Sequence, residues 1–188
     1  MRRFLTILLG STAMVAAFAA AYLGLLRLEG NFHTVIAGEL YRSAQPTPAR
    51  LADYAHDFGI RSVINLRGSA PEKAWYQDEL AATQALGIVH ADFGMAADRM
   101  LSVDEFGSLV ALLRAAPKPL LIHCQAGADR SGLAAAIYLA AISGSDEQAA
   151  EKQLSFRYGH IALPFVSRAF ATDESWERLE PLLGFRRS

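Results

Sequence analysis

One short segment of the chain carries residue types that could act on phosphate. Residues 123–131 have the sequence HCQAGADRS, so five residues separate the only cysteine, Cys124, from Arg130. A loop of that length can wrap one tetrahedral oxyanion with backbone N–H groups, and a helix that starts there adds the positive end of its dipole. The same surroundings stabilise a thiolate, so we expect Cys124 to be a nucleophile at neutral pH.

The other side chains of this segment have distinct expected roles. Arg130 can bind two phosphoryl oxygens with its planar guanidinium and stabilise charge in a transition state. Ser131 can donate a hydrogen bond to the sulfur and help it leave, whereas His123 is expected to hold the loop through a buried hydrogen bond. The predicted phosphate-binding residues are Gln125, Ala126, Gly127, Ala128, Asp129 and Arg130. A buried structural thiol or a rhodanese-like sulfur carrier would not require an arginine that closes the loop.

The segment resembles the phosphate-binding loop of the cysteine-dependent protein tyrosine and dual-specificity phosphatases, whose pattern is H-C-x-x-G-x-x-R followed by Ser or Thr. The strings YRSAQP at 41–46 and INLR at 64–67 resemble those of small bacterial, plant and fungal dual-specificity-like members. This resemblance implies a cysteinyl-phosphate intermediate, no metal and no cofactor. It implies a phosphorylated protein or inositol-type substrate, and members acting on highly phosphorylated inositols tend to carry lysines in this loop. A catalytically silent phospho-binding module is the alternative from another class.

Family members protonate the leaving oxygen with an aspartate on a loop before the helix that precedes the phosphate loop. Asp98 is the predicted general acid, because it lies in the irregular segment Phe93–Leu101, which could bring a carboxyl group over the pocket. Asp92, at the end of an expected strand, is the alternative.

Several basic residues lie outside the Cys124 segment. Arg67 resembles the arginine that borders the pocket in related sequences, which implies contact with substrate, and a solvated or carboxylate-paired arginine at the end of a strand is the alternative. Arg42, Arg99 and His160 are interpreted as surface or capping residues, because exposed positions are the commoner ones for these types, and a place on the pocket rim is the alternative.

The pattern around these residues predicts an α/β fold with a central, mainly parallel sheet flanked by helices, because short apolar runs alternate with helical periods. The apolar strand before Cys124 would lead into the loop, and an alanine-rich helix would follow it. Expected strands cover residues 60–66, 88–91 and 120–123, and expected helices cover 47–58, 71–86, 102–115, 131–143, 145–158 and 173–183.

Composition limits the remaining possibilities. The chain has 188 residues, a formal net charge of −1 and one cysteine, which favours a single main domain and excludes an intrachain disulfide or a thiolate-rich metal site. Its basic residues are scattered, so a nucleic-acid partner is not expected.

The N-terminal segment has a different composition from the rest. Phe4–Leu26 runs for 23 residues without a charge, which is long enough for a membrane-spanning helix. We therefore divide the chain into an anchor or signal segment, 1–30, and a phosphatase-like domain, 31–188. Arg2 and Arg3 favour a single-pass protein with a periplasmic catalytic domain. Export after cleavage of a signal peptide, or a cytoplasmic-facing anchor, are the alternatives.

Overall fold

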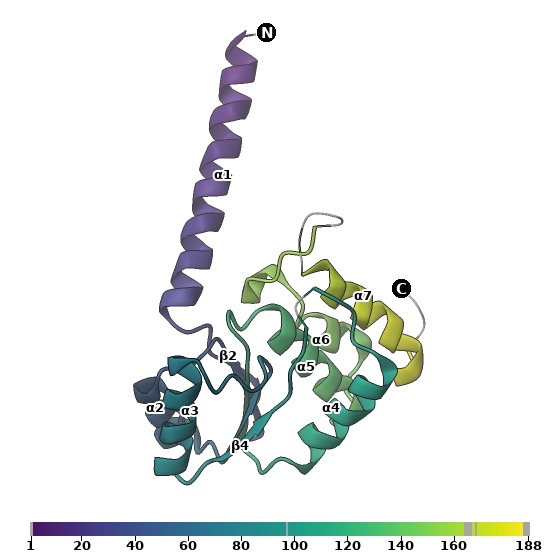
Figure 1. Cartoon of the computed structure of the whole chain (residues 1–188). Coiled ribbons are helices and arrows are strands. Elements are labelled where there is room, and N and C mark those ends of the chain that lie inside the picture. Colours follow the sequence, from purple (N-terminus) through teal and green to yellow (C-terminus); the bar gives the residue numbers. More distant parts are fainter. Residues whose placement is uncertain (1, 97, 164–166, 168, 186–188) are drawn as a thin grey trace.

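A five-stranded sheet forms the centre of the computed structural model, which describes residues 2–96, 98–163, 167 and 169–185 (Figure 1). The strand order is β1-β2-β5-β3-β4. The β1–β2 pair is antiparallel and the other three pairs are parallel, so the expected mainly parallel α/β sheet is confirmed. The strands are β1 (His33–Ile36), β2 (Leu40–Ser43), β3 (Ser62–Asn65), β4 (Val89–Asp92) and β5 (Leu120–His123).

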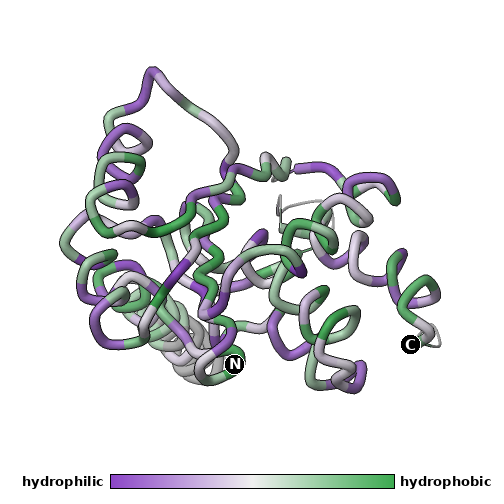
Figure 2. The backbone as a smooth tube through the Cα atoms, turned by 90° about the horizontal axis from the view of Figure 1, so that it is seen from below, coloured by the Kyte–Doolittle hydropathy of each residue, from purple (hydrophilic) through white to green (hydrophobic). Residues whose placement is uncertain are grey.

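Helices cover both faces of the sheet and bury two hydrophobic clusters. Side chains of a strand alternate between faces, so Leu120 and Ile122 of β5 enter one cluster and Leu121 enters the other. In Figure 2 hydrophobic stretches of the backbone, coloured green, lie near the centre of the molecule. The larger cluster involves α4 (Val103–Ala115), α5 (Asp129–Ala141) and α7 (Phe170–Leu179), and the smaller one involves α2 (Pro48–Phe58), with α3 (Ala74–Ala85) beside it.

Several helix boundaries follow from capping residues as predicted. Thr47 accepts a hydrogen bond at the start of α2, and Gly59 ends that helix in the left-handed conformation. Ser102 and Glu105 form the expected capping box of α4. These ends could be predicted because they depend only on neighbouring residues.

Other boundaries differ from the prediction. The helix expected over 145–158 is a short helix, α6 (Glu147–Glu151), followed by a separate 3-10 turn, η1 (Phe156–Tyr158). Asp146 rather than Ser145 caps α6, because its carboxylate accepts from the N–H of Ala149 at 2.7 Å. The last helix starts earlier, and a 3-10 turn, η2 (Glu180–Leu183), continues it.

The N-terminal segment forms one helix, α1 (Arg2–Leu28), that extends away from the sheet in Figure 1. Its end contacts the rest of the chain, since Tyr22 stacks on Phe156 at 5.4 Å between ring centroids and donates to the carbonyl of Arg157 at 2.6 Å. Among the residues that the structure describes, no helix is both long and apolar enough to cross a membrane. The assignment of residues 1–30 to a membrane anchor or signal segment, with its boundary at residue 30, stays a prediction.

Candidate active site

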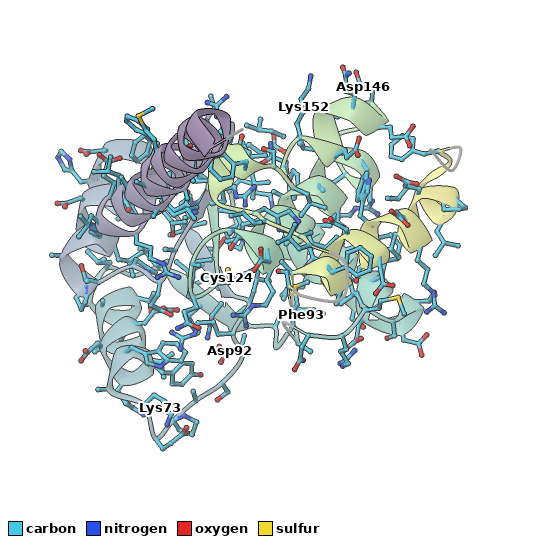
Figure 3. All side chains as sticks on the ribbon, turned by 90° about the horizontal axis from the view of Figure 1, so that it is seen from above. Lys73, Asp92, Phe93, Cys124, Asp146 and Lys152 are labelled. Atoms are coloured by element: carbon cyan, nitrogen blue, oxygen red, sulfur yellow. The ribbon has the colours of Figure 1, made fainter. Side chains whose placement is uncertain are left out.

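The loop that carries Cys124 joins the carboxyl end of β5 to the first turn of α5, as the sequence predicted. Cys124 is only 3% exposed and lies near the middle of the molecule when it is viewed from above (Figure 3). Arg130 belongs to α5, which begins at Asp129, two residues earlier than expected. The nucleophile and the arginine are thus brought to one end of the parallel strands.

The backbone carbonyl groups of this loop are held from outside. The buried Arg42 guanidinium donates to the carbonyl oxygens of Gly127 and Ala128 at 2.8 Å each. The Asn31 side chain donates to the carbonyl of Ala126 at 2.9 Å, and the N–H of Gln45 donates to the carbonyl of Gln125 at 3.4 Å. Four successive carbonyl groups of the loop therefore point away from its centre.

This arrangement decides where the amide N–H groups point. In a trans peptide the C=O and the next N–H face opposite directions, so the N–H groups of Ala126, Gly127, Ala128 and Asp129 face the inside of the loop. Within the described part of the chain, the N–H groups from Gln125 to Arg130 donate to no protein acceptor. A ring of inward N–H donors at a helix N-terminus is a binding site for a tetrahedral anion.

Arg42 and Gly127 make this loop conformation possible. Arg42 is fully buried, so its interpretation as a surface or capping residue is wrong. Burial lowers the pKa of Arg42 to about 10, against the opposing effect of Cys124, Tyr158 and Asp129, and it remains a cation at neutral pH. Gly127 has a φ of +72°, and a Cβ there would lie 2.5 Å from the nitrogen of Ala44.

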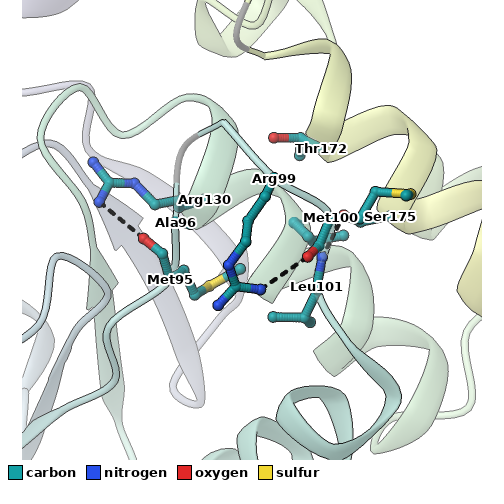
Figure 4. A pocket seen from close by; sticks show the side chains of 9 residues that line it. Met95, Ala96, Arg99, Met100, Leu101, Arg130, Thr172 and Ser175 are labelled. Carbon is teal, nitrogen blue, oxygen red and sulfur yellow. Dashed lines mark hydrogen bonds between the residues drawn. The ribbon is translucent and has the colours of Figure 1, made fainter.

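Two arginines lie beside the loop opening. Arg130 donates to the carbonyl oxygens of Leu66 and Met95 at 3.4 Å each, and Figure 4 shows its contact with Met95. Arg67 stacks over Trp75 at 3.5 Å from the ring centroid. Burial and then the nearby charge of Arg130 lower the pKa of Arg67, whereas Cys124 raises it, which places the Arg67 guanidinium in the electrostatic neighbourhood of both Arg130 and the thiol.

A buried carboxylate anchors the start of the loop. Glu79, on α3, accepts from His123 at 2.9 Å and from His90 at 2.8 Å, so His123 holds the loop by a buried hydrogen bond as expected. The Gln45 amide also donates to Glu79 and accepts from Arg67 at 2.9 Å. Burial alone would raise the pKa of Glu79, but the bonds from His123, His90 and Gln45 outweigh it and hold the pKa at about 2.

A buried histidine anchors the other end of the loop. The two ring nitrogens of His160 lie 2.7 Å from the carboxylates of Asp129 and of Asp173 on α7. Burial alone would lower the pKa of His160, but the two carboxylates outweigh it and raise the pKa to about 9. His160 is therefore a buried cation that ties the loop to α7, and its interpretation as a surface or capping residue is wrong.

The two candidate acids have different surroundings. Asp92 bonds to the Asn65 amide at 2.8 Å and to the Tyr76 hydroxyl, and both of its carboxylate oxygens are thus engaged. Asp98 is exposed, and its carboxylate has no hydrogen bond within the described residues. Its segment touches the site through Met95, whose carbonyl accepts from Arg130.

Ser131 is placed differently from the expectation. Its buried hydroxyl donates to the carbonyl of Ser43 at 3.4 Å, which links α5 to β2. Arg99 donates to Glu105 at 2.8 Å and stays on the surface, as expected.

Comparison with known proteins assigns the family. The sequence profile of the Tyrosine phosphatase family matches residues 23–154, which is more than half of the chain. The chain belongs to the tyrosine phosphatase family. The geometry of the Cys124 loop agrees with the family's cysteine-dependent chemistry, so this protein is a phosphatase. No curated protein sequence matches the chain.

Solved structures of other family members share the fold. TpbA from P. aeruginosa is 25% identical with a TM-score of 0.60, and the match covers 83% of this chain and 92% of TpbA. A cysteine-to-serine variant of TpbA in complex with pTyr is 26% identical with a TM-score of 0.56, over 70% of this chain and 76% of that one. The PP-IP phosphatase Siw14 from S. cerevisiae is 20% identical with a TM-score of 0.58, over 82% and 93%, and shows the fold alone.

Proposed function

We propose that this phosphatase hydrolyses phosphate monoesters of phosphotyrosine or dual-specificity protein substrates through a cysteinyl-phosphate intermediate. The observation that carries the proposal is the loop itself. Arg42, Asn31 and the N–H of Gln45 hold its carbonyl groups outward, which leaves a ring of free N–H donors around the buried Cys124. Such a ring binds the three non-bridging oxygens of a phosphoryl group and stabilises charge on them in the transition state.

The first chemical step transfers the phosphoryl group to the enzyme. The Cys124 thiolate attacks phosphorus, a sulfur–phosphorus bond forms, and the ester oxygen leaves with its bonding electrons. Asp98 donates a proton to that oxygen. Arg130 exchanges its two long contacts with backbone carbonyls for the phosphoryl oxygens, which offer a charged and bidentate partner.

The second step releases inorganic phosphate. Water attacks the phosphorus, the sulfur–phosphorus bond breaks, and the thiolate is restored, while the Asp98 carboxylate accepts a proton from the water. Arg67 adds a second guanidinium beside the phosphoryl group, and its stacking on Trp75 and its bond to Gln45 keep it oriented. Ser131 supports the loop through β2 and, when the sulfur carries the phosphoryl group, can turn its hydroxyl to the sulfur.

Protein substrates are favoured over inositol phosphates by the loop composition. Residues 125–129 carry no lysine or arginine, and Asp129 adds a carboxylate that His160 neutralises. TpbA, a relative at 25% identity, has been solved with pTyr in a cysteine-to-serine form. The inositol-type substrate is the second candidate, because the fold is shared with Siw14.

A substrate panel together with one variant tests this function. The purified protein should release phosphate from a phosphotyrosine peptide faster than from inositol hexakisphosphate. Cys124→Ser should lose turnover by roughly 10⁴-fold or more, because a hydroxyl group without a dedicated base is a poor nucleophile. The same variant should still bind the phosphopeptide, since the N–H donors remain. Turnover near that of the unmodified protein would contradict the covalent mechanism, and a preference for the inositol phosphate would contradict the substrate class.

The cellular location is a separate proposal. From the basic residues that precede the apolar segment of α1, we expect the catalytic domain to lie outside the cytoplasm. A reporter enzyme that is active only in the periplasm, fused after Ser188, should be active. If that fusion is inactive while a fusion to a reporter that works only in the cytoplasm is active, the proposed location is wrong. The proposed chemistry does not depend on this result.

A further inference from the structure

A cavity adjoins the phosphate loop on the side where α1 ends. It has a volume of about 490 Å³. Gln125 and Ala126 of the loop form one wall, and Gln45, which bonds to Arg67 beside the thiol, forms another. Arg27, at the end of α1, and Arg50, in the first turn of α2, also line it. A substrate that extends beyond its phosphoryl group can therefore reach this cavity.

The cavity is positively charged and its charges are uncompensated. Both of its charged lining residues are arginines, and the described lining includes no carboxylate. Neither Arg27 nor Arg50 forms an ion pair with any residue that the structure describes. The whole chain has a net charge of −1, so this local excess of positive charge is not a consequence of a generally basic surface.

The wall that carries these arginines is fixed to the phosphate loop. Asn31 donates to the carbonyl oxygens of Ala126 and Tyr158 at 2.9 Å each, and the N–H of Ala44 donates to Gly30 at 2.8 Å. Arg50 donates to the carbonyl of Leu28, which places its guanidinium against the turn after α1. Arg50, held beside the site in this way, loses less conformational entropy when it binds an anion.

We propose that this cavity is a specificity subsite for a phosphopeptide, in which Arg27 and Arg50 bind an acidic side chain next to the phosphorylated residue. The subsite rests on the proposed function and extends it. Guanidinium groups bind carboxylates with paired N–H donors, and the amide of Gln125 supplies a further donor at the wall that the catalytic loop forms. The preferred substrate is thus a phosphotyrosine peptide with flanking glutamate or aspartate.

The test compares three substrates with the full-length chain. These are phenyl phosphate, a phosphotyrosine peptide with alanine neighbours, and the same peptide with glutamate neighbours. The double variant Arg27→Gln, Arg50→Gln should lower kcat/KM for the glutamate peptide about fivefold. It should leave the other two substrates unchanged, and its effect should disappear at high ionic strength.

Two further variants separate recognition from structure. Arg50 supports the turn after α1, so Arg27→Glu, at an exposed position, provides an independent charge reversal with the same expected selectivity. Arg61→Gln is the matched control, because Arg61 is exposed at the opposite end of the sheet, before β3. Equal losses on all three substrates, or no preference for the glutamate peptide, would each overturn the subsite.

Binding measurements keep the subsite independent of the catalytic proposal. If the unmodified protein hydrolyses none of the three substrates, the proposed function fails. The two peptides can then be compared by calorimetry, in which Cys124→Ser should bind the glutamate peptide several times more tightly, and equal affinities would overturn the subsite.

Discussion

The phosphate loop and the neighbouring segment that carries Asp98 differ in how many hydrogen bonds hold their functional groups. Every carbonyl from Gln125 to Ala128 has a donor, and buried charges hold both ends of the loop, Glu79 through His123 and His160 through Asp129. By contrast, Asp98 is exposed and its carboxylate is without a hydrogen bond among the described residues. Binding of a transition state requires donors fixed in advance, whereas a proton donor must follow the leaving group.

Arg130→Lys tests the phosphate loop, the rigid half of this comparison, and its expected loss of kcat is the largest. An ammonium group is a point charge and cannot reproduce the planar fork, so kcat should fall about 10²- to 10³-fold. Steady-state hydrolysis of phenyl phosphate provides the measurement. The free energy of unfolding should change little, because the Arg130 side chain makes only two long hydrogen bonds of 3.4 Å to the part of the chain that the structure describes. A variant that retains most of its activity would show that the N–H ring alone stabilises the transition state.

Asp98→Asn tests the exposed segment, because the effect of losing a general acid depends on the basicity of the leaving group. A general acid matters most when the departing oxygen is strongly basic, so hydrolysis of phenyl phosphate should fall about 100-fold. Hydrolysis of 4-nitrophenyl phosphate, with its weakly basic leaving group, should fall much less. Rates for both esters should be measured for each variant.

Asp92→Asn is the matched control for this experiment. Asp92 bonds to Asn65 and Tyr76, so its replacement should affect both esters equally through the local structure. The selective loss on phenyl phosphate in Asp92→Asn, and its absence in Asp98→Asn, would assign the acid to Asp92.

The same contrast explains what the sequence could predict. The loop from Cys124 to Arg130 was predictable because its function depends on backbone groups and on a local spacing of residues. The caps of α2 and α4 were predictable for the same reason. Arg42, Glu79 and His160 act across 85, 44 and 31 residues, so a local pattern gave no sign of their partners. The one available signal was Arg42 itself, a charged residue within the short and buried strand β2.

Glu79→Gln should weaken the anchor at the start of the loop. The amide keeps the shape of the side chain but removes the charge that accepts from His123 and His90, so the free energy of unfolding should fall by about 2 kcal/mol at pH 7. The folded-state pKa of Glu79 is about 2, below its ordinary 4.5. Its stabilising contribution is therefore present above pH 4.5 and is lost as the pH falls toward 2.

Urea unfolding between pH 3 and pH 7 measures this dependence. The difference between Glu79→Gln and the unmodified protein should shrink as the pH falls. Asp78→Asn, at the adjacent exposed position on α3, is the control and should show no such convergence. A difference that remains constant with pH would mean that Glu79 contributes through packing rather than charge.

His160→Gln should have the smallest effect, at the other end of the loop. The folded-state pKa of His160 is about 9, above its ordinary 6.5, so its stabilising contribution is complete below pH 6.5 and is lost as the pH rises through 9. Asp129 and Asp173 are partly open to solvent, and we therefore expect the variant to be less stable by only about 1 kcal/mol at pH 6. That difference should disappear by about pH 10, as measured by urea unfolding across this range. His56→Gln is the control, because His56 is exposed and, among the described residues, pairs only with its neighbour Asp57. If the His160→Gln difference persisted at pH 10, the link between the loop and α7 would depend on the shape of the ring and not on its charge.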